Sequence, residues 1–131
     1  LKPGDTVALF MTNRWEYIAV WFGLSKVGIV TSLINSQLSG HSLAHCLTIG
    51  ETRHAIVEGA LSEAYDAARS CDLGDIRAWS FDGGFSGTEG LDDVLAGMSD
   101  SRPERALREA VEPGDSVLKM FTSGTTGLQM P

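Results

Sequence analysis

The sequence is poor in several features that would assign a protein to a broad class. Its 131 residues include two cysteines, too few for a disulfide-dense secreted scaffold. Lysine and arginine number 10 against 17 acidic residues, and the net charge of −7 argues against a nucleic-acid-binding surface. The longest apolar run, residues 17–24, is much shorter than the roughly 20 residues that span a bilayer. No signal peptide is visible, so we expect a water-soluble chain without a nucleic-acid partner.

Patterns typical of metal and dinucleotide sites are also missing. His41, His45 and His54 are scattered, and no paired cysteine or histidine spacing indicates a zinc site. Two cysteines are enough for one disulfide, between Cys46 and Cys71, but two reduced, partly buried thiols are the simpler interpretation. Residues 82–90 contain four glycines without a G-x-G-x-x-G pattern, which predicts a surface loop rather than a dinucleotide site.

What the sequence does contain is an alternation of apolar runs and helical segments. Short apolar or alternating runs predict strands at residues 7–11, 29–34, 54–57, 76–81 and 117–121. Helical spacing and turn residues predict helices at 14–27, 39–48 and 61–70, with shorter ones at 92–98 and 103–111. Strands that alternate with helices indicate an α/β fold, with a mostly parallel sheet flanked by helices.

The first predicted helix, residues 14–27, carries a dense group of aromatic side chains. Thr12 or Asn13 is a candidate N-terminal cap, and Gly28 is a natural C-terminal stop. An interfacial membrane surface is one interpretation of the aromatic group, but at helical spacing such side chains are more typical of a core. The residues that we expect in the core are Trp15, Tyr17, Trp21 and Phe22.

The last predicted strand runs directly into a segment rich in glycine and hydroxyl groups. Glycine lets the backbone approach a ligand closely, and successive N–H groups can form a concave nest for phosphate oxygens. Ligands of parallel sheets bind beyond the C-terminal ends of the strands. A plain polar turn is the alternative that composition leaves open, and the segment is not a Walker A loop. The candidate phosphate-binding residues are Thr122, Ser123, Gly124, Thr125, Thr126 and Gly127.

The string from Phe121 to Gly127 closely resembles the signature loop of the adenylate-forming, or AMP-binding, superfamily. The resemblance continues upstream through residues 2–9, the Asn13-Arg14-x-Glu16 motif and residues 21–28. Residues 33–47 are similar to the fatty acid transport protein branch, the very-long-chain acyl-CoA synthetases. On this resemblance, residues 1–131 form an incomplete N-terminal part of the AMP-binding domain that ends in the phosphate-binding loop.

The resemblance implies a two-step ligase reaction for the parent protein. A fatty acid carboxylate attacks the α-phosphate of ATP, giving an acyl-adenylate and pyrophosphate, and coenzyme A then takes the acyl group with release of AMP. Mg²⁺ would offset charge on the phosphates. Hydroxyl donation is assigned to Ser123, Thr125 and Thr126, and backbone N–H donation to Gly124 and Gly127. No catalytic residue and no metal ligand is assigned within this chain.

One position departs from the family pattern. The loop usually continues with a variable residue, a proline and a lysine, whereas Leu128, Gln129 and Met130 follow here. An adenylating enzyme for another carboxylic acid, or a non-catalytic nucleotide-binding remnant, is therefore an open alternative. The remaining machinery would follow Pro131, so we expect this polypeptide alone to be inactive. The branch implies a location in the cytoplasm or on the cytoplasmic side of a membrane, with membrane contact made by segments outside this chain.

Overall fold

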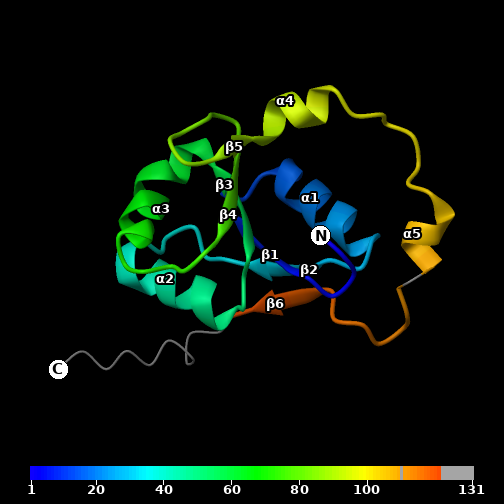
Figure 1. Ribbon diagram of the computed structural model, residues 1–131, viewed down its shortest axis with the longest axis horizontal. Helices are drawn as coiled ribbons and strands as arrows, with labels where there is room; N and C mark the ends of the chain where they lie inside the picture. Colours follow the sequence, from blue (N-terminus) through cyan, green and yellow to red (C-terminus); the bar gives the residue numbers. More distant parts are fainter. Residues whose placement is uncertain (110, 122–131) are drawn as a thin grey trace.

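The protein is an α/β sandwich of one sheet and its flanking helices (Figure 1). The computed structural model describes residues 1–109 and 111–121, and six strands of this part form the sheet. The strands are β1 (Thr6–Phe10), β2 (Val30–Leu33), β3 (His54–Glu58), β4 (Arg77–Phe81), β5 (Glu89–Gly90) and β6 (Leu118–Met120). The helices are α1 (Trp15–Ser25), α2 (Gly40–Ile49), α3 (Ser62–Arg69), α4 (Leu91–Ala96) and α5 (Arg105–Glu109), with a 3₁₀ turn, η1 (Gly59–Leu61), before α3. The predicted α/β class is confirmed.

The strands of the described part pair in parallel, in the order β5-β4-β3-β1-β2-β6. The first strand of the chain therefore lies inside the sheet, with Ala8 opposite Ser32 of β2 and Ala55 of β3. All five residues of β1 are buried, as expected for a parallel strand that is covered on both faces. The predicted parallel sheet with helices on its faces is thus confirmed.

β1 divides its side chains between two apolar cores, because successive residues of a strand point to opposite faces. Val7 and Leu9 belong to the core that α1 and α4 cover. Ala8 and Phe10 belong to the core on the other face, beneath α2 and α3. Figure 1 shows α1 and α4 on one side of the strands and α2 and α3 on the other.

The expectation that the aromatic group of α1 is core is wrong for two of its four members. Tyr17 and Trp21 are partly buried against the sheet, but Trp15 is 75% exposed and Phe22 is 55% exposed. The sheet covers one side of a helix, and Trp15 and Phe22 lie two turns apart on the opposite side. α1 therefore presents apolar groups to both its neighbours and its surroundings.

The predicted ends of α1 are half right. Arg14 is the N-cap residue and no side chain caps the helix, so the cap expected from Thr12 or Asn13 is wrong. Gly28 adopts a φ of 75°, and the N–H group of Ile29 donates to the carbonyl of Leu24 over 3.0 Å, which closes the helix as predicted.

The predicted surface loop at residues 82–90 ends in an element that the sequence did not suggest. Its last two residues form β5, which pairs with β4. The guanidinium of Arg77 donates to both carboxylate oxygens of Glu89, over 2.6 and 2.9 Å, and this ion pair joins the two strands. The two cysteines are free thiols, as expected, with Cys46 buried and Cys71 partly buried.

Candidate functional site

The carboxyl ends of the strands define the edge of the sheet where a parallel α/β protein binds ligands. β1 and β3 are neighbours, yet the helix after β1 lies on one face of the sheet and α3, after β3, lies on the other. Such a divergence opens a crevice between adjacent strand ends. The carboxyl ends of β1, β3, β4 and β6 therefore form the candidate site.

The predicted phosphate-binding loop follows the last of these strands. The expected strand at 117–121 is present as β6, whose Leu118 pairs with Thr31 of β2 in parallel register. Its carboxyl end thus lies at the same edge as that of β1. The loop residues, Thr122 to Gly127, lie outside the described residues, and their phosphate-binding role stays a prediction.

Polar side chains gather at the carboxyl ends of β1, β3 and β4, and we call this group the strand-end cluster. It centres on the guanidinium of Arg14, in the turn between β1 and α1. Arg14 forms a bidentate pair with Glu16, with N–O distances of 2.8 and 2.8 Å. Its Nη1 atom also donates to Glu58 over 3.1 Å and to Asp82 over 2.6 Å. The members of the cluster are Thr12, Arg14, Glu16, Glu58 and Asp82.

Glu58 is the buried acid of the strand-end cluster, with 8% of its side chain exposed. Its Oε2 atom accepts two hydrogen bonds from Thr12, from the backbone N–H and from the hydroxyl, both over 2.7 Å. Burial would raise the pKa of Glu58, but the Thr12 hydrogen bonds and the Arg14 charge outweigh it and lower this pKa below its usual value. The carboxylate is therefore held in its charged form.

Arg14 and Glu16 stabilise each other's charge in the same way. The hydrogen bonds that Arg14 donates to Glu16 and then to Asp82 raise the pKa of Arg14, and the bonds to Glu16 lower the pKa of that carboxylate. The guanidinium carbon also lies 5.4 Å from the centre of the Phe81 ring, within the range of a cation–π contact. The strand-end cluster thus ties three strand ends together through one cation.

Sequence reasoning noticed Asn13-Arg14-x-Glu16 as a motif but missed the strand-end cluster. The partners of Arg14 stand 44 and 68 residues further along the chain, at Glu58 and Asp82. Each of these acids follows or ends an apolar run, and parallel strands bring such positions to one edge. An acidic residue at the end of a predicted parallel strand was therefore the sequence signal that indicates Glu58 and Asp82 as partners of Arg14.

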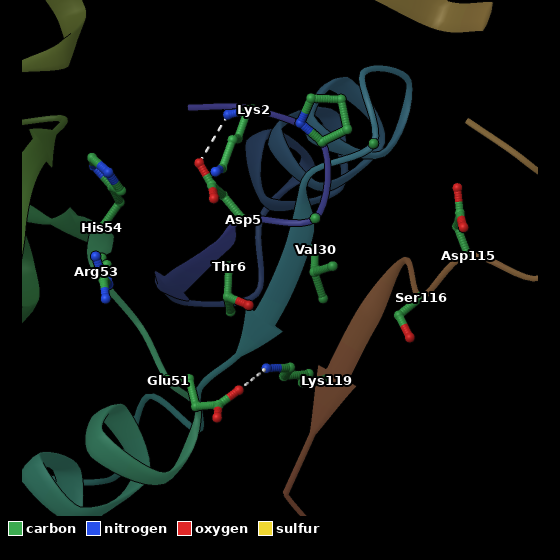
Figure 2. Close-up of a pocket in the computed structure, with 13 residues that line it drawn as sticks. Lys2, Asp5, Thr6, Val30, Glu51, Arg53, His54, Asp115, Ser116 and Lys119 are labelled. Carbon is green, nitrogen blue, oxygen red and sulfur yellow. Dashed lines mark hydrogen bonds and ion pairs between the residues drawn. The ribbon is translucent and has the colours of Figure 1, made fainter. Parts of the chain in front are cut away.

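A cavity of about 800 Å³ lies at the opposite edge of the sheet, by the amino ends of β1, β2 and β3 (Figure 2). Its charges are of both signs and are partly matched. Lys119 donates to the carbonyl of Gly50 over 3.1 Å and lies 3.5 Å from the Glu51 carboxylate, and the backbone N–H of Lys2 donates to Asp5 over 2.8 Å. The cavity thus has a mixed lining with no dominant charge.

Membrane-spanning helices and metal-ligand clusters are both absent from the described residues. None of the helices described is long and apolar enough to cross a bilayer. Within the same residues, no group of three or more histidine, cysteine or acidic side chains has the arrangement of a metal site.

The fold is that of a known class of protein. The AMP-binding enzyme family matches residues 1–129, and the chain belongs to that family. It is 35% identical to mouse long-chain fatty acid transport protein 6 over 98% of this chain and 21% of that protein. It also resembles long-chain fatty acid transport protein 1 of cattle, with 34% identity over 96% of this chain and 20% of that protein.

Solved structures support the same relationship. The inhibitor-bound N-terminal domain of FACL13 from Mycobacterium tuberculosis superposes with a TM-score of 0.77 and 28% identity, over 98% of this chain and 30% of that domain. A fatty acyl CoA synthetase of the same organism gives a TM-score of 0.75 and 28% identity, over 95% of this chain and 23% of its own. The chain thus spans about a fifth of the length of the curated relatives it matches.

Proposed function

We propose that the parent protein is an ATP-dependent fatty acid–CoA ligase of the AMP-forming type, and that residues 122–127 hold the phosphates of ATP. The observation that carries the proposal is the position of β6. β6 ends at the carboxyl edge of a parallel sheet, where such folds bind ligands, and the glycine- and hydroxyl-rich segment follows it in the sequence. Family membership and similarity to fatty acid transport proteins support the substrate class.

The described residues fit a site in which the loop itself supplies the phosphate contacts. In the strand-end cluster, the cation Arg14 already contacts three carboxylates and is not free to bind a triphosphate. Adjacent strands are about 4.8 Å apart, so the ends of β1 and β6, with β2 between them, are separated by roughly 10 Å. The proposed phosphate contacts are therefore the backbone N–H groups of Gly124 and Gly127 and the hydroxyls of Ser123, Thr125 and Thr126.

In the proposed reaction, a fatty acid oxygen bonds to the α-phosphorus of ATP while the bond to pyrophosphate breaks. The coenzyme A sulfur then bonds to the acyl carbon and AMP leaves. The loop would hold the departing pyrophosphate, and fixed donors of this kind stabilise charge without reorganising. Mg²⁺ would neutralise part of the phosphate charge when bound. Residues 1–131 would form the front part of the AMP-binding domain.

Fatty-acid-dependent exchange of pyrophosphate into ATP by the full-length protein tests this proposal. Losing one neutral hydrogen bond of about 0.5–1.5 kcal/mol lowers a rate by roughly two- to tenfold, and loss of a preorganised donor costs more. We expect Ser123→Ala and Thr126→Ala each to lower kcat/KM for ATP by about tenfold or more. Ser99→Ala, at an exposed site outside the loop, is the control and should leave the rate unchanged.

The carboxylic acid on which exchange depends distinguishes the proposed fatty acid–CoA ligase from the alternative functions. Exchange that depends on a long-chain fatty acid supports the ligase assignment. Exchange that requires an aryl or amino acid instead would show an adenylating enzyme of another specificity. ATP binding without exchange for any acid would show a nucleotide-binding remnant, in keeping with Met130 at the position where the family usually has lysine.

A further inference from the structure

The segment after β2 brings polar side chains without charge to the carboxyl edge of the sheet. β2 ends at Leu33, and residues 34–39 lead from it to α2. Four of these six side chains carry hydrogen-bonding groups and none is charged; they are Asn35, Ser36, Gln37 and Ser39. β2 lies between β1 and β6 in the sheet. The uncharged segment therefore follows the strand that pairs with β6.

The register of β2 and β6 puts Asn35 beside the end of β6. Leu33 of β2 is the partner of Met120 of β6, and Asn35 follows Leu33 by two residues. The backbone N–H of Ile34 still donates to the carbonyl of Leu9 over 3.1 Å, so the chain leaves the sheet at Asn35. Adjacent strands are about 4.8 Å apart. The carboxamide of Asn35 is thus within reach of a ligand held just beyond Met120.

One end of the Asn35 carboxamide is bonded and the other is open. Its Oδ1 atom accepts a hydrogen bond from the backbone N–H of Gln37 over 2.9 Å, which forms a turn typical of asparagine. Because the oxygen faces this N–H group, the NH₂ group must point elsewhere. Asn35 is exposed, and its NH₂ group donates to no atom of residues 1–109 or 111–121. Two donor hydrogens are therefore available to a ligand at the carboxyl edge.

Charge distinguishes this side of the carboxyl edge from the strand-end cluster. In that cluster, the cation Arg14 meets three carboxylates, so negative charge is in excess. A triphosphate placed beside the ends of β1, β3 and β4 would be repelled by that excess. The segment after β2 supplies neutral donors instead. The electrostatics therefore favour phosphate groups on the side of β2 and β6.

We propose that Asn35 binds ATP, with its NH₂ group donating to a phosphate oxygen of the nucleotide. This inference rests on the function proposed above, because it requires ATP at the carboxyl edge, and it adds one side chain to the contacts proposed for residues 122–127. The bond to Gln37 orients the carboxamide before ATP binds, which reduces the ordering cost of binding. A neutral donor also holds an anion less strongly than a cation does, so pyrophosphate can leave after the first step.

Two substitutions of Asn35 in the full-length protein distinguish a phosphate contact from a purely structural turn. Asn35→Asp keeps an oxygen that accepts from Gln37, because aspartate forms the same turn as asparagine. It also puts a negative charge where the NH₂ group can lie. Asn35→Ala removes both the acceptor and the donor. A residue that serves only the turn should tolerate aspartate better than alanine, whereas a residue that contacts phosphate should tolerate alanine better.

Fatty-acid-dependent pyrophosphate exchange measures the difference. We expect kcat/KM for ATP to fall by about tenfold in Asn35→Ala and by at least about a hundredfold in Asn35→Asp. The KM for the fatty acid should stay within about twofold, since the proposed contact is to the nucleotide. Gln37→Glu adds the same charge at an exposed position of the same turn and is the matched control. It should lower kcat/KM for ATP by less than about threefold, because exposed charges are screened.

Calorimetric titration of the same variants with ATP gives a readout that does not need turnover. Exchange by the unsubstituted protein decides the proposed function, whereas the order of the two Asn35 variants decides the role of Asn35. Where exchange is absent, the ATP affinities give that order. Asn35 is exposed, so all variants should melt within a few degrees of the unsubstituted protein. A smaller loss with aspartate than with alanine, equal losses in Asn35→Asp and Gln37→Glu, or a change confined to the KM for the fatty acid would each overturn the inference.

Discussion

Glu58 shows how a single buried charge depends on residues far away in the sequence. It ends β3 with 8% of its side chain exposed, and Thr12 and Arg14 supply its hydrogen bonds from the turn after β1. A buried carboxylate is tolerated only when its oxygens are paired. The strand-end cluster therefore holds the ends of three strands together, in addition to forming ion pairs at the surface.

The lowered pKa of Glu58 makes its contribution to stability depend on pH. A carboxyl whose pKa is lower in the folded than in the unfolded protein stabilises the fold above the unfolded pKa, near 4.3. That contribution is lost as the pH falls through the folded pKa. Glu58→Gln removes the charge, so we expect it to lower the free energy of unfolding at pH 7 by about 1–2 kcal/mol. The difference from the unmodified protein should shrink below about pH 4.

Urea unfolding at pH 7 and at pH 3.5, followed by tryptophan fluorescence, measures both quantities for Glu58→Gln. Glu63→Gln on the exposed face of α3 is the matched control and should change the free energy by less than about 0.5 kcal/mol. An equal loss at the two pH values would show that Glu58 contributes by shape and hydrogen bonding rather than by charge.

At the scale of elements, apolar runs predicted most of the sheet. The runs around residues 7–11 and 54–57 became β1 and β3, because a parallel strand buried on both faces is apolar at nearly every position. The period-two alternation at residues 76–81 became β4, which is buried at alternate positions. β5 was not predicted, since two residues carry no periodicity and their place in the sheet comes from pairing with β4. The sequence likewise predicted the apolar character of α1 but not which of its sides the sheet would cover.

The candidate site was only partly predictable for a related reason. The loop at residues 122–127 is local in sequence, so its residue types suggested phosphate binding beside a plain polar turn, and its resemblance to the family's signature loop favoured phosphate binding. The strand-end cluster is not local, since its contacts join positions 14, 58 and 82 through the order of strands in the sheet. Apolar periodicity predicts which residues of a strand are buried, but it does not predict which strands lie next to each other in the sheet.

Two glycines show how differently neighbouring elements constrain a position. A Cβ atom at Gly59, just after β3, would lie 2.7 Å from the carbonyl oxygens of both Asp82 and Gly83. These are backbone atoms at the end of β4, so Gly59→Ala forces the two strand ends apart. We expect it to lower the free energy of unfolding by about 1–3 kcal/mol.

Gly23→Ala is the matched control for Gly59→Ala in the 131-residue chain. Its Cβ atom would meet nothing within 4 Å, and alanine favours a helix interior over glycine by about 0.5–1 kcal/mol. Thermal or urea unfolding of the two variants should therefore move in opposite directions. A loss of stability of similar size in both would mean that helix propensity and strand-end packing do not explain the two positions.

At the scale of the whole molecule, the sheet of the described residues has an open edge. β6 pairs with β2 on one side only, and the apolar side chains of Val117, just before β6, and of Met120, its last residue, are 44% and 64% exposed. Exposed strand edges can pair with other chains. The 131-residue chain carries the proposed phosphate loop without the other four-fifths of the length of its relatives.

We expect the 131-residue chain alone to give no fatty-acid-dependent pyrophosphate exchange and to associate with increasing concentration. The first outcome follows because positioning of both substrates needs groups beyond the loop, and the second follows from the open edge of β6. Exchange assays and sedimentation velocity on the purified chain check them, with the full-length protein as the positive control. Robust exchange by a monodisperse chain would contradict both expectations.

The cavity at the amino ends of the strands has a consequence for inhibitor discovery. A five-residue strand such as β1 is roughly 15 Å long, so this cavity and the carboxyl edge lie on opposite ends of the sheet. A compound chosen because it fills the space beside Thr6 and His54 would leave the carboxyl edge unoccupied. Its potency should then be insensitive to nucleotide concentration, and competition kinetics would distinguish such compounds from those that act at the end of β6.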